Sequence, residues 1–328
     1  MCLLNGVGAF GQGSGQAQQV PGSTPLPLPP ATDTVAPNIP GVVAGGTKVQ
    51  VVKEGFKSTD GPIGLPDGSL LFWDFLGSQI VKIDNNGNLS TFLTRGSGVG
   101  RTIAQALALD SKGRLISVDK DKTSARIAVV YPPGSEQVLA ESFEGKPISD
   151  PNDLVVDKKG GVYYTLAAER EVQYVRPDGT VIRVLSEKVE EPNGLQLSPD
   201  EKILYVSEHG RVARVDHANL DTEGGEYILA FDIQPDGTVR NRRHFAKYEP
   251  PRRRPEGSLI RAGGDGLAID GEGRVYAATP WEFRSSARRV STSASFRYRG
   301  IPRTWPLPGL TRRCCTSVPV VPSTRSRC

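Results

Sequence analysis

Five segments of the chain place an oxygen-bearing side chain directly before a short apolar run. These side chains are two carboxylates, two asparagine amides and one glutamine amide, at Asp60, Gln105, Asn152, Asn193 and Asp265. Carboxylate and amide oxygens are hard ligands, and a set with two negative charges suits Ca²⁺ best, followed by Mg²⁺ and Mn²⁺. If the fold brings these five positions together, they would form a cation site.

A purely local explanation competes with this one. Asp and Asn before Gly or Pro commonly form turns, because their short side chains bond to the backbone nearby. That explanation suffices for any single position, such as Asp60 before Gly61. The recurrence of a polar residue at the same point of several similar segments favours a shared site.

The elements that would position these residues come from an internal repeat. Five segments share one plan of a strand, a tight polar turn and a second strand with alternating apolar residues. The turns are marked by Asp67, Lys112, Lys159, Asp200 and Glu272, at intervals of 45, 47, 41 and 72 residues. A repeat of about 40–50 residues that holds four short strands is typical of a β-propeller blade. We therefore predict an all-β propeller with five legible blades, and the pattern stops inside another.

Propeller geometry supplies a reason for the five polar positions to meet. The first strand of each blade is the innermost, and the innermost strands surround a common axial channel. The starts of these strands converge at one mouth of that channel. Positions spread from Asp60 to Asp265 along the chain would thereby form one ring.

These motifs resemble the SMP-30/gluconolactonase/luciferin-regenerating-enzyme (LRE)-like family. The resemblance covers about residues 55–280 and rests on four motifs, Asp60-Gly-Pro, Pro151-Asn-Asp, Pro192-Asn-Gly and Asp265-Gly-Leu. It implies a six-bladed propeller whose last blade is disrupted here. It also implies a hydrolase acting on a carboxylic ester bond in a sugar lactone or related ester. The implied cofactor is one divalent metal ion, Ca²⁺ first, with Mg²⁺, Mn²⁺ or Zn²⁺ as alternatives.

The resemblance also assigns roles to residues. The family's metal ligands fall on Asp60, Asn152, Asn193 and Asp265. Asp265 would additionally take a proton from the attacking water, while a metal ion polarises the lactone carbonyl. Gln105 and Asn152 would bind the substrate.

The chain departs from the family pattern at three places. Asp60 stands where the family usually has Glu, and it is one methylene shorter. Gln105-Ala106 stands where Asn-Gly is common, which changes a position expected to contact substrate. Leu166 stands where an Asp is often found.

Charge and composition divide the chain into three parts. Residues 1–45 combine a weak signal-like start with a linker rich in Gly, Pro and Ser, and residues 46–280 form the predicted propeller. Residues 281–328 contain ten Arg and one acidic residue, a net charge of +9, whereas residues 1–280 carry −5. This Arg/Ser/Pro-rich tail is predicted to be out of frame or disordered. The rival explanation is a genuine basic tail that binds an acidic partner.

Composition excludes several classes of protein. No stretch reaches the roughly 20 apolar residues of a membrane span. Cysteine occurs only at positions 2, 314, 315 and 328, so the propeller region has neither a disulfide framework nor a thiol nucleophile. Without a basic stripe in that region we expect no nucleic-acid partner.

The function classes left open are three. The first is a metal-dependent lactonase or esterase with a small-molecule substrate. The second is a non-catalytic propeller that binds a ligand or a protein, and the third is another enzyme of the strictosidine-synthase-like group. We expect a monomer. The sequence leaves two locations open: secreted or periplasmic, or cytoplasmic.

Overall fold

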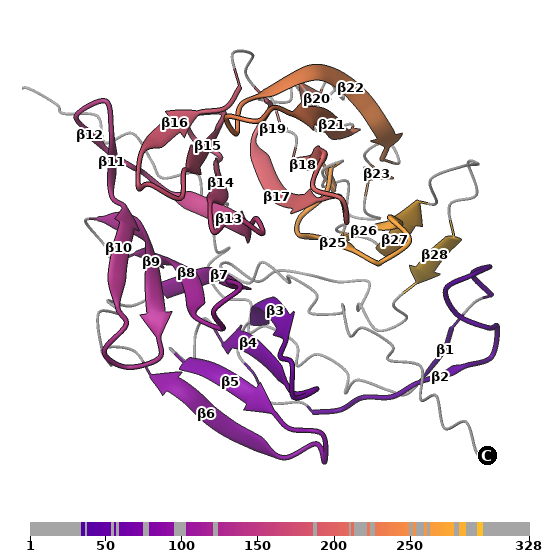
Figure 1. Cartoon of the computed structure of the whole chain (residues 1–328). Helices are drawn as coiled ribbons and strands as arrows, with labels where there is room; N and C mark the ends of the chain where they lie inside the picture. The colour runs from indigo at the N-terminus through magenta and orange to yellow at the C-terminus, as the bar shows by residue number, and fades with distance from the viewer. Residues whose placement is uncertain are drawn as a thin grey trace, which may run out of the picture.

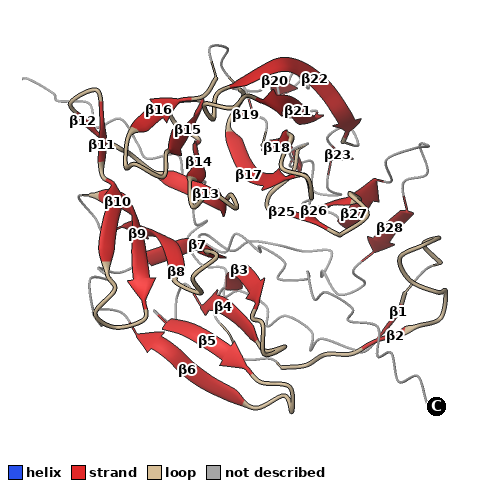
Figure 2. Ribbon diagram, viewed as in Figure 1, coloured by secondary structure: helices blue, strands red, loops and turns tan. Residues whose placement is uncertain are grey.

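Every regular element that the structure describes is a β-strand (Figure 2). The computed structural model describes residues 34–36, 38–53, 56, 59–74, 79–94, 103–120, 124–185, 189–209, 211–212, 222–223, 227–248, 252–253, 259–260, 263–278, 282–286 and 294–297. Over these ranges, no helix with the length and apolar character of a membrane span is present.

Twenty of the strands form five antiparallel sheets of four strands each. The first contains β3 (Thr59–Gly64), β4 (Leu70–Asp74), β5 (Gln79–Ile83) and β6 (Leu89–Thr94). The second contains β7 (Ile103–Leu109), β8 (Leu115–Lys120), β9 (Ala125–Tyr131) and β10 (Gln137–Ala140). The third contains β13 (Pro151–Val156), β14 (Val162–Leu166), β15 (Glu171–Val175) and β16 (Val181–Arg183).

The last two sheets follow the same order along the chain. The fourth contains β17 (Pro192–Leu197), β18 (Ile203–Glu208), β21 (Tyr227–Ile233) and β22 (Val239–Lys247). The fifth contains β25 (Leu267–Ile269), β26 (Val275–Ala278), β27 (Glu282–Ser286) and β28 (Ala294–Arg297). Two strands of this fifth sheet, β27 and β28, lie beyond residue 280, the predicted end of the propeller.

The five sheets stand around a common centre, with the first strand of each innermost (Figure 1). Successive inner strands touch, since β3 contacts β7, β7 contacts β13, β13 contacts β17, and β17 contacts β25. This arrangement is a β-propeller, and the five sheets correspond to the five blades that the repeat predicted. The fold class is therefore confirmed.

Turn chemistry explains the regular blade plan. The turn between the first two strands holds a residue with positive φ in every sheet: Gly68, Gly113, Gly160, Glu201 and Gly273. Glycine adopts this conformation without a steric cost, which is why it occupies four of the five positions. In three of these turns an Asp at the end of the inner strand accepts backbone N–H bonds from residues two and four positions on.

The apolar core forms four layers, each between neighbouring sheets. In the layer between the second and third sheets, Ile127 and Tyr164 are fully buried, and Leu204 is fully buried in the next layer. Alternating apolar residues of each strand therefore pack against the next blade, and these layers set the distance between the inner strands.

Four two-stranded antiparallel pairs lie outside the five large sheets. They are β1 (Thr34–Val35) with β2 (Lys48–Val49), β11 (Ser142–Phe143) with β12 (Lys146–Pro147), β19 (Arg211–Val212) with β20 (Thr222–Glu223), and β23 (Arg252–Arg253) with β24 (Leu259–Ile260). The segment between β1 and β2 falls mostly within the predicted linker, yet Ala36 and Ile39 are buried and Gly41 lies against the Arg274 side chain. This N-terminal segment thus contacts the turn between β25 and β26 of the fifth sheet.

Candidate functional site

The predicted site residues lie where the inner strands begin. Asp60 is in β3, Gln105 in β7, Asn152 in β13 and Asn193 in β17, and Asp265 lies two residues before β25. The side chain of Gln105 lies outside the described part of the structure, so its contact with substrate stays a prediction.

Four inner strands carry a β-bulge at this position. The pairing register shifts between Asp60 and Ile63, between Ala104 and Leu107, between Pro151 and Leu154, and between Pro192 and Leu195. A bulge leaves a residue unpaired and turns its side chain out of the regular pleat. The repeated bulge therefore explains how a polar residue at the start of an apolar strand avoids the layers between the sheets.

Two carboxylates from other blades, Asp60 and Asp265, come within electrostatic range of Asp153 in the third sheet. Asp153, next to Asn152 in β13, is enclosed by protein, and this desolvation raises the pKa of its carboxyl to about 7. The negative charges of Asp60 and Asp265 contribute to this raised pKa, and the backbone N–H groups of Leu154 and Leu195 oppose it. The first and fifth sheets thus each place an acidic side chain close enough to influence Asp153 of the third sheet. Asp153 was missed by the sequence reasoning, although it stands inside the Pro151-Asn-Asp motif.

Asn193 presents a buried acceptor to the same place. The residue is only 8% exposed, and its Oδ1 atom has no hydrogen-bond partner among the described residues. An unsatisfied buried acceptor costs about 1–3 kcal/mol, so it needs an explanation such as a bound ion. Its neighbour Gly194 lies directly against the backbone of Asp265 and Gly266, which puts Asn193 beside the fifth sheet.

This set of donors fits a hard cation. Over the part of the chain that the structure describes, no group of three Asp, Glu, His or Cys side chains could hold a metal ion by itself. A cation here would therefore take amide oxygens as well as carboxylates. The unpartnered oxygen of Asn193 and the partly buried Asn152 in the next bulge are such donors.

Backbone strain marks the entry to two of the bulges. Asp150 and Glu191 precede Pro151 and Pro192, and their φ angles are 41° and 40°. A following proline favours extended backbone, so a left-handed conformation at a non-glycine residue is unfavourable there. Strain of this kind gathers at functional sites. Both strained residues lie two positions before a predicted metal ligand, Asn152 or Asn193.

A pair of buried hydroxyls supports the backbone next to Asp265. The hydroxyl oxygens of Ser207 and Tyr248 lie 2.8 Å apart in a hydrogen bond. A Cβ atom at Gly264 would overlap both of them, so only glycine fits at this position. The Gly264 N–H also donates to the Glu208 carbonyl oxygen at 3.1 Å. These contacts fix the chain one residue before Asp265, and nothing in the sequence indicated them.

Close backbone approach makes a first prediction about stability. We expect Gly194→Ala to lower the free energy of unfolding by about 2–3 kcal/mol, because the new methyl group would overlap the Asp265 carbonyl oxygen. Gly266→Ala is the matched control, since no atom of the described residues lies within 4 Å of the Cβ position there. Urea denaturation of the two variants checks the difference, and equal stabilities would contradict the close contact.

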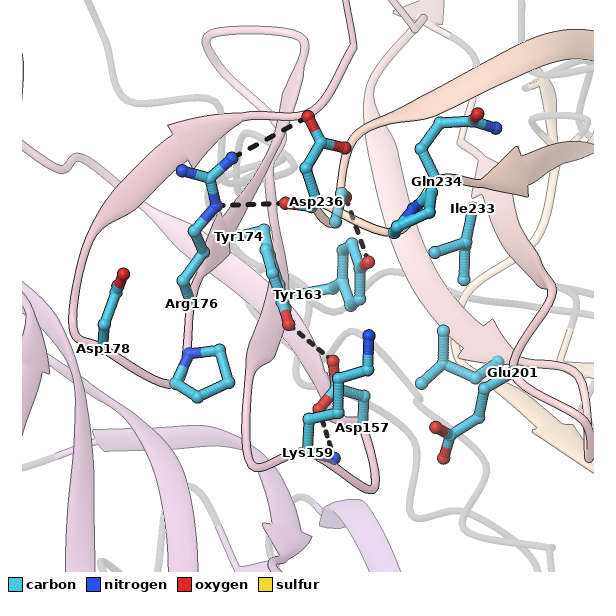
Figure 3. Close-up of a pocket in the computed structure, with 14 residues that line it drawn as sticks. Asp157, Lys159, Tyr163, Tyr174, Arg176, Asp178, Glu201, Ile233, Gln234 and Asp236 are labelled. Atoms are coloured by element: carbon cyan, nitrogen blue, oxygen red, sulfur yellow. Dashed lines mark hydrogen bonds and ion pairs between the residues drawn. The ribbon is translucent and has the colours of Figure 1, made fainter.

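A separate cleft of about 280 Å³ lies between the third and fourth sheets (Figure 3). Its walls are the turns after β13, β15, β17 and β21, so it lies about one strand length, roughly 17 Å, from the strand starts. Tyr163 and Tyr174 stack in it with ring centroids 4.1 Å apart. Their hydroxyls donate to the Gly237 carbonyl oxygen and to Asp157. These hydroxyls bond to groups in the turns that line the cleft. The cleft is distinct from the candidate site.

Comparison with known proteins finds a matching family and several relatives. Residues 58–295 match the protein family described as the SMP-30/gluconolactonase/LRE-like region. A gluconolactonase of Zymomonas mobilis is 25% identical over 269 residues, covering 75% of this chain and 71% of that protein. The adipocyte plasma membrane-associated protein of Rattus norvegicus is 26% identical over 222 residues, and 58% of each chain is covered.

Solved structures show the same fold. A gluconolactonase from Xanthomonas campestris superposes with a TM-score of 0.63 at 20% identity, covering 85% of this chain and 89% of that chain. Regucalcin from Agrobacterium tumefaciens, described as a calcium-binding protein, superposes with a TM-score of 0.52 at 16% identity, covering 75% of this chain and 77% of that chain.

Proposed function

Because the chain belongs to the SMP-30/gluconolactonase/LRE-like family, we propose that it hydrolyses a lactone with the help of one divalent metal ion. The proposed ligands are Asp60, Asn152, Asn193 and Asp265. The observation that supports the metal site is the buried Oδ1 atom of Asn193, which has no hydrogen-bond partner among the described residues. The charges of Asp60 and Asp265 act on the nearby Asp153 carboxyl. Oxygen donors of this kind favour Ca²⁺.

The chemistry follows from the donor set. A bound divalent ion would polarise the lactone carbonyl and stabilise the negative charge that develops on its oxygen. The Asp265 carboxylate accepts the proton of the water that attacks the carbonyl carbon. The ring C–O bond then breaks, and the same proton passes to the leaving ring oxygen, which becomes a hydroxyl group of the open acid. Asn152 and Gln105 orient the substrate by hydrogen bonds to its hydroxyl groups. The relative named gluconolactonase supports a sugar lactone as the proposed substrate class.

Metal content and turnover together test this function. We expect purified protein to bind one Ca²⁺ per chain by calorimetry and to accelerate gluconolactone hydrolysis above the spontaneous rate. Chelation with EDTA should abolish the acceleration, and added Ca²⁺ should restore it. Ca²⁺ binding without turnover on any of a panel of lactones would contradict the hydrolase and favour a ligand-binding propeller.

A further inference from the structure

The bulges in β13 and β17 leave backbone groups that cannot pair within their own sheets. Every buried backbone N–H and C=O group needs a partner, so a bulge requires a substitute for the lost ladder bond. In β13 the N–H of Asp153 lies between the paired positions Pro151 and Leu154, and in β17 the carbonyl of Asn193 lies between the paired positions Pro192 and Leu195.

The hydroxyl of Thr165 serves both groups. Its Oγ1 atom accepts the Asp153 N–H at 3.0 Å and donates to the Asn193 carbonyl oxygen at 2.8 Å. Thr165 is in β14 and is fully buried, so no water competes for these bonds. One side chain thus joins the bulges of two neighbouring blades, both of which carry a proposed ligand.

The Asp153 carboxylate makes a second link across the same interface. One oxygen accepts the Leu154 N–H at 2.8 Å, and the other accepts the Leu195 N–H at 3.2 Å. Leu195 closes the β17 bulge that holds Asn193. The backbone around Asn193 is therefore held at two points. The Thr165 hydroxyl bonds to the Asn193 carbonyl oxygen, and the Asp153 carboxylate bonds to the N–H of Leu195, two residues further along the chain.

We propose that Thr165 is a positioning residue for Asn193. Its hydroxyl fixes the backbone from which the Asn193 amide projects, and so sets the direction of the unpartnered amide oxygen. Residues that hold a metal ligand in place typically change metal affinity about 10–100-fold when they are replaced. This role rests on the proposed function, because it requires a cation at Asn193.

The test compares Thr165→Val, which keeps the shape and removes the hydroxyl, with Thr165→Ser, which keeps the hydroxyl. We expect Thr165→Val to bind Ca²⁺ at least about tenfold more weakly by titration calorimetry, and Thr165→Ser to stay within about threefold of wild type. Ser117→Ala is the control, because Ser117 is also buried but its hydroxyl bonds to the carbonyl of the next residue in its own strand. It should leave Ca²⁺ affinity unchanged.

Urea denaturation of the Thr165 variants in EDTA measures their stability without metal, and so separates a role in positioning Asn193 from a role in general stability. If Thr165 acts only by positioning, both variants are fully folded under the conditions of the titration. The affinity for Ca²⁺ then falls in Thr165→Val and returns to the wild-type range in Thr165→Ser. If Thr165→Val does not fold, Thr165→Cys, with a weaker donor of similar size, carries the same comparison and should bind more weakly than Thr165→Ser.

The outcomes distinguish the two proposals. Wild-type affinity for Ca²⁺ in folded Thr165→Val, or in Thr165→Cys if the valine variant does not fold, would overturn the positioning role and leave the proposed function intact. A wild-type protein that binds no Ca²⁺ would overturn the metal site and the positioning role together.

Discussion

Replacing Asp265 with asparagine is expected to slow gluconolactone hydrolysis about 1,000-fold. The asparagine side chain would keep the size of the residue and one oxygen donor, but it could not accept a proton from water. General base catalysis contributes about 10²–10⁴-fold to a rate, which sets the size of the effect. The measurement is the turnover rate of Asp265→Asn at saturating lactone and saturating Ca²⁺, with the spontaneous rate subtracted.

The matched control for this variant is Asp236→Asn in the cleft at the other end of the strands. Asp236 bonds to Thr238 in its own turn and faces Arg176, so its replacement removes the same charge far from the candidate site. We expect its turnover rate to stay within about twofold of wild type. A similar loss in both variants, or no loss in Asp265→Asn, would exclude Asp265 as the base.

Replacing Asn193 with leucine is expected to abolish Ca²⁺ binding while making the metal-free protein more stable. The wild-type residue buries an acceptor that has no partner in the described structure, and an apolar side chain of similar size removes that cost. We therefore expect the free energy of unfolding in EDTA to rise by about 1 kcal/mol. The Ca²⁺-dependent increase in Tm should disappear, because that increase requires a site that binds the folded state.

A second buried amide provides the control for Asn193→Leu. Gln173 is 3% exposed, and its side chain is satisfied by the Tyr164 hydroxyl and by Glu171. Gln173→Leu leaves the Tyr164 hydroxyl without this partner, so it should lower stability by about 1–3 kcal/mol and leave Ca²⁺ binding unchanged. Thermal melts with and without Ca²⁺ report both effects. Loss of metal-free stability in Asn193→Leu would mean that its amide has a structural role.

Short-range chemistry made the blades predictable. A Gly with positive φ and an Asp that accepts backbone N–H bonds act within about five residues, so the turns at Gly113, Gly160 and Gly273 could be found in the sequence. The repeat of these turns then predicted five blades and their inner strands. It also placed the five candidate residues at or just before the strand starts, where their backbone lies in the structure.

The supports of the site required the tertiary structure. Thr165 bonds to a carbonyl 28 residues away, Asp153 to an N–H 42 residues away, and Ser207 to a hydroxyl 41 residues away. The first two pairs are set by the packing of the third blade on the fourth, and the third pair joins two distant segments of the fourth blade. No local pattern in the sequence records them. The sequence by itself therefore determined the blades and the candidate ligands. The tertiary structure decided which buried groups hold the backbone around them, because those bonds form only when segments far apart in the sequence meet.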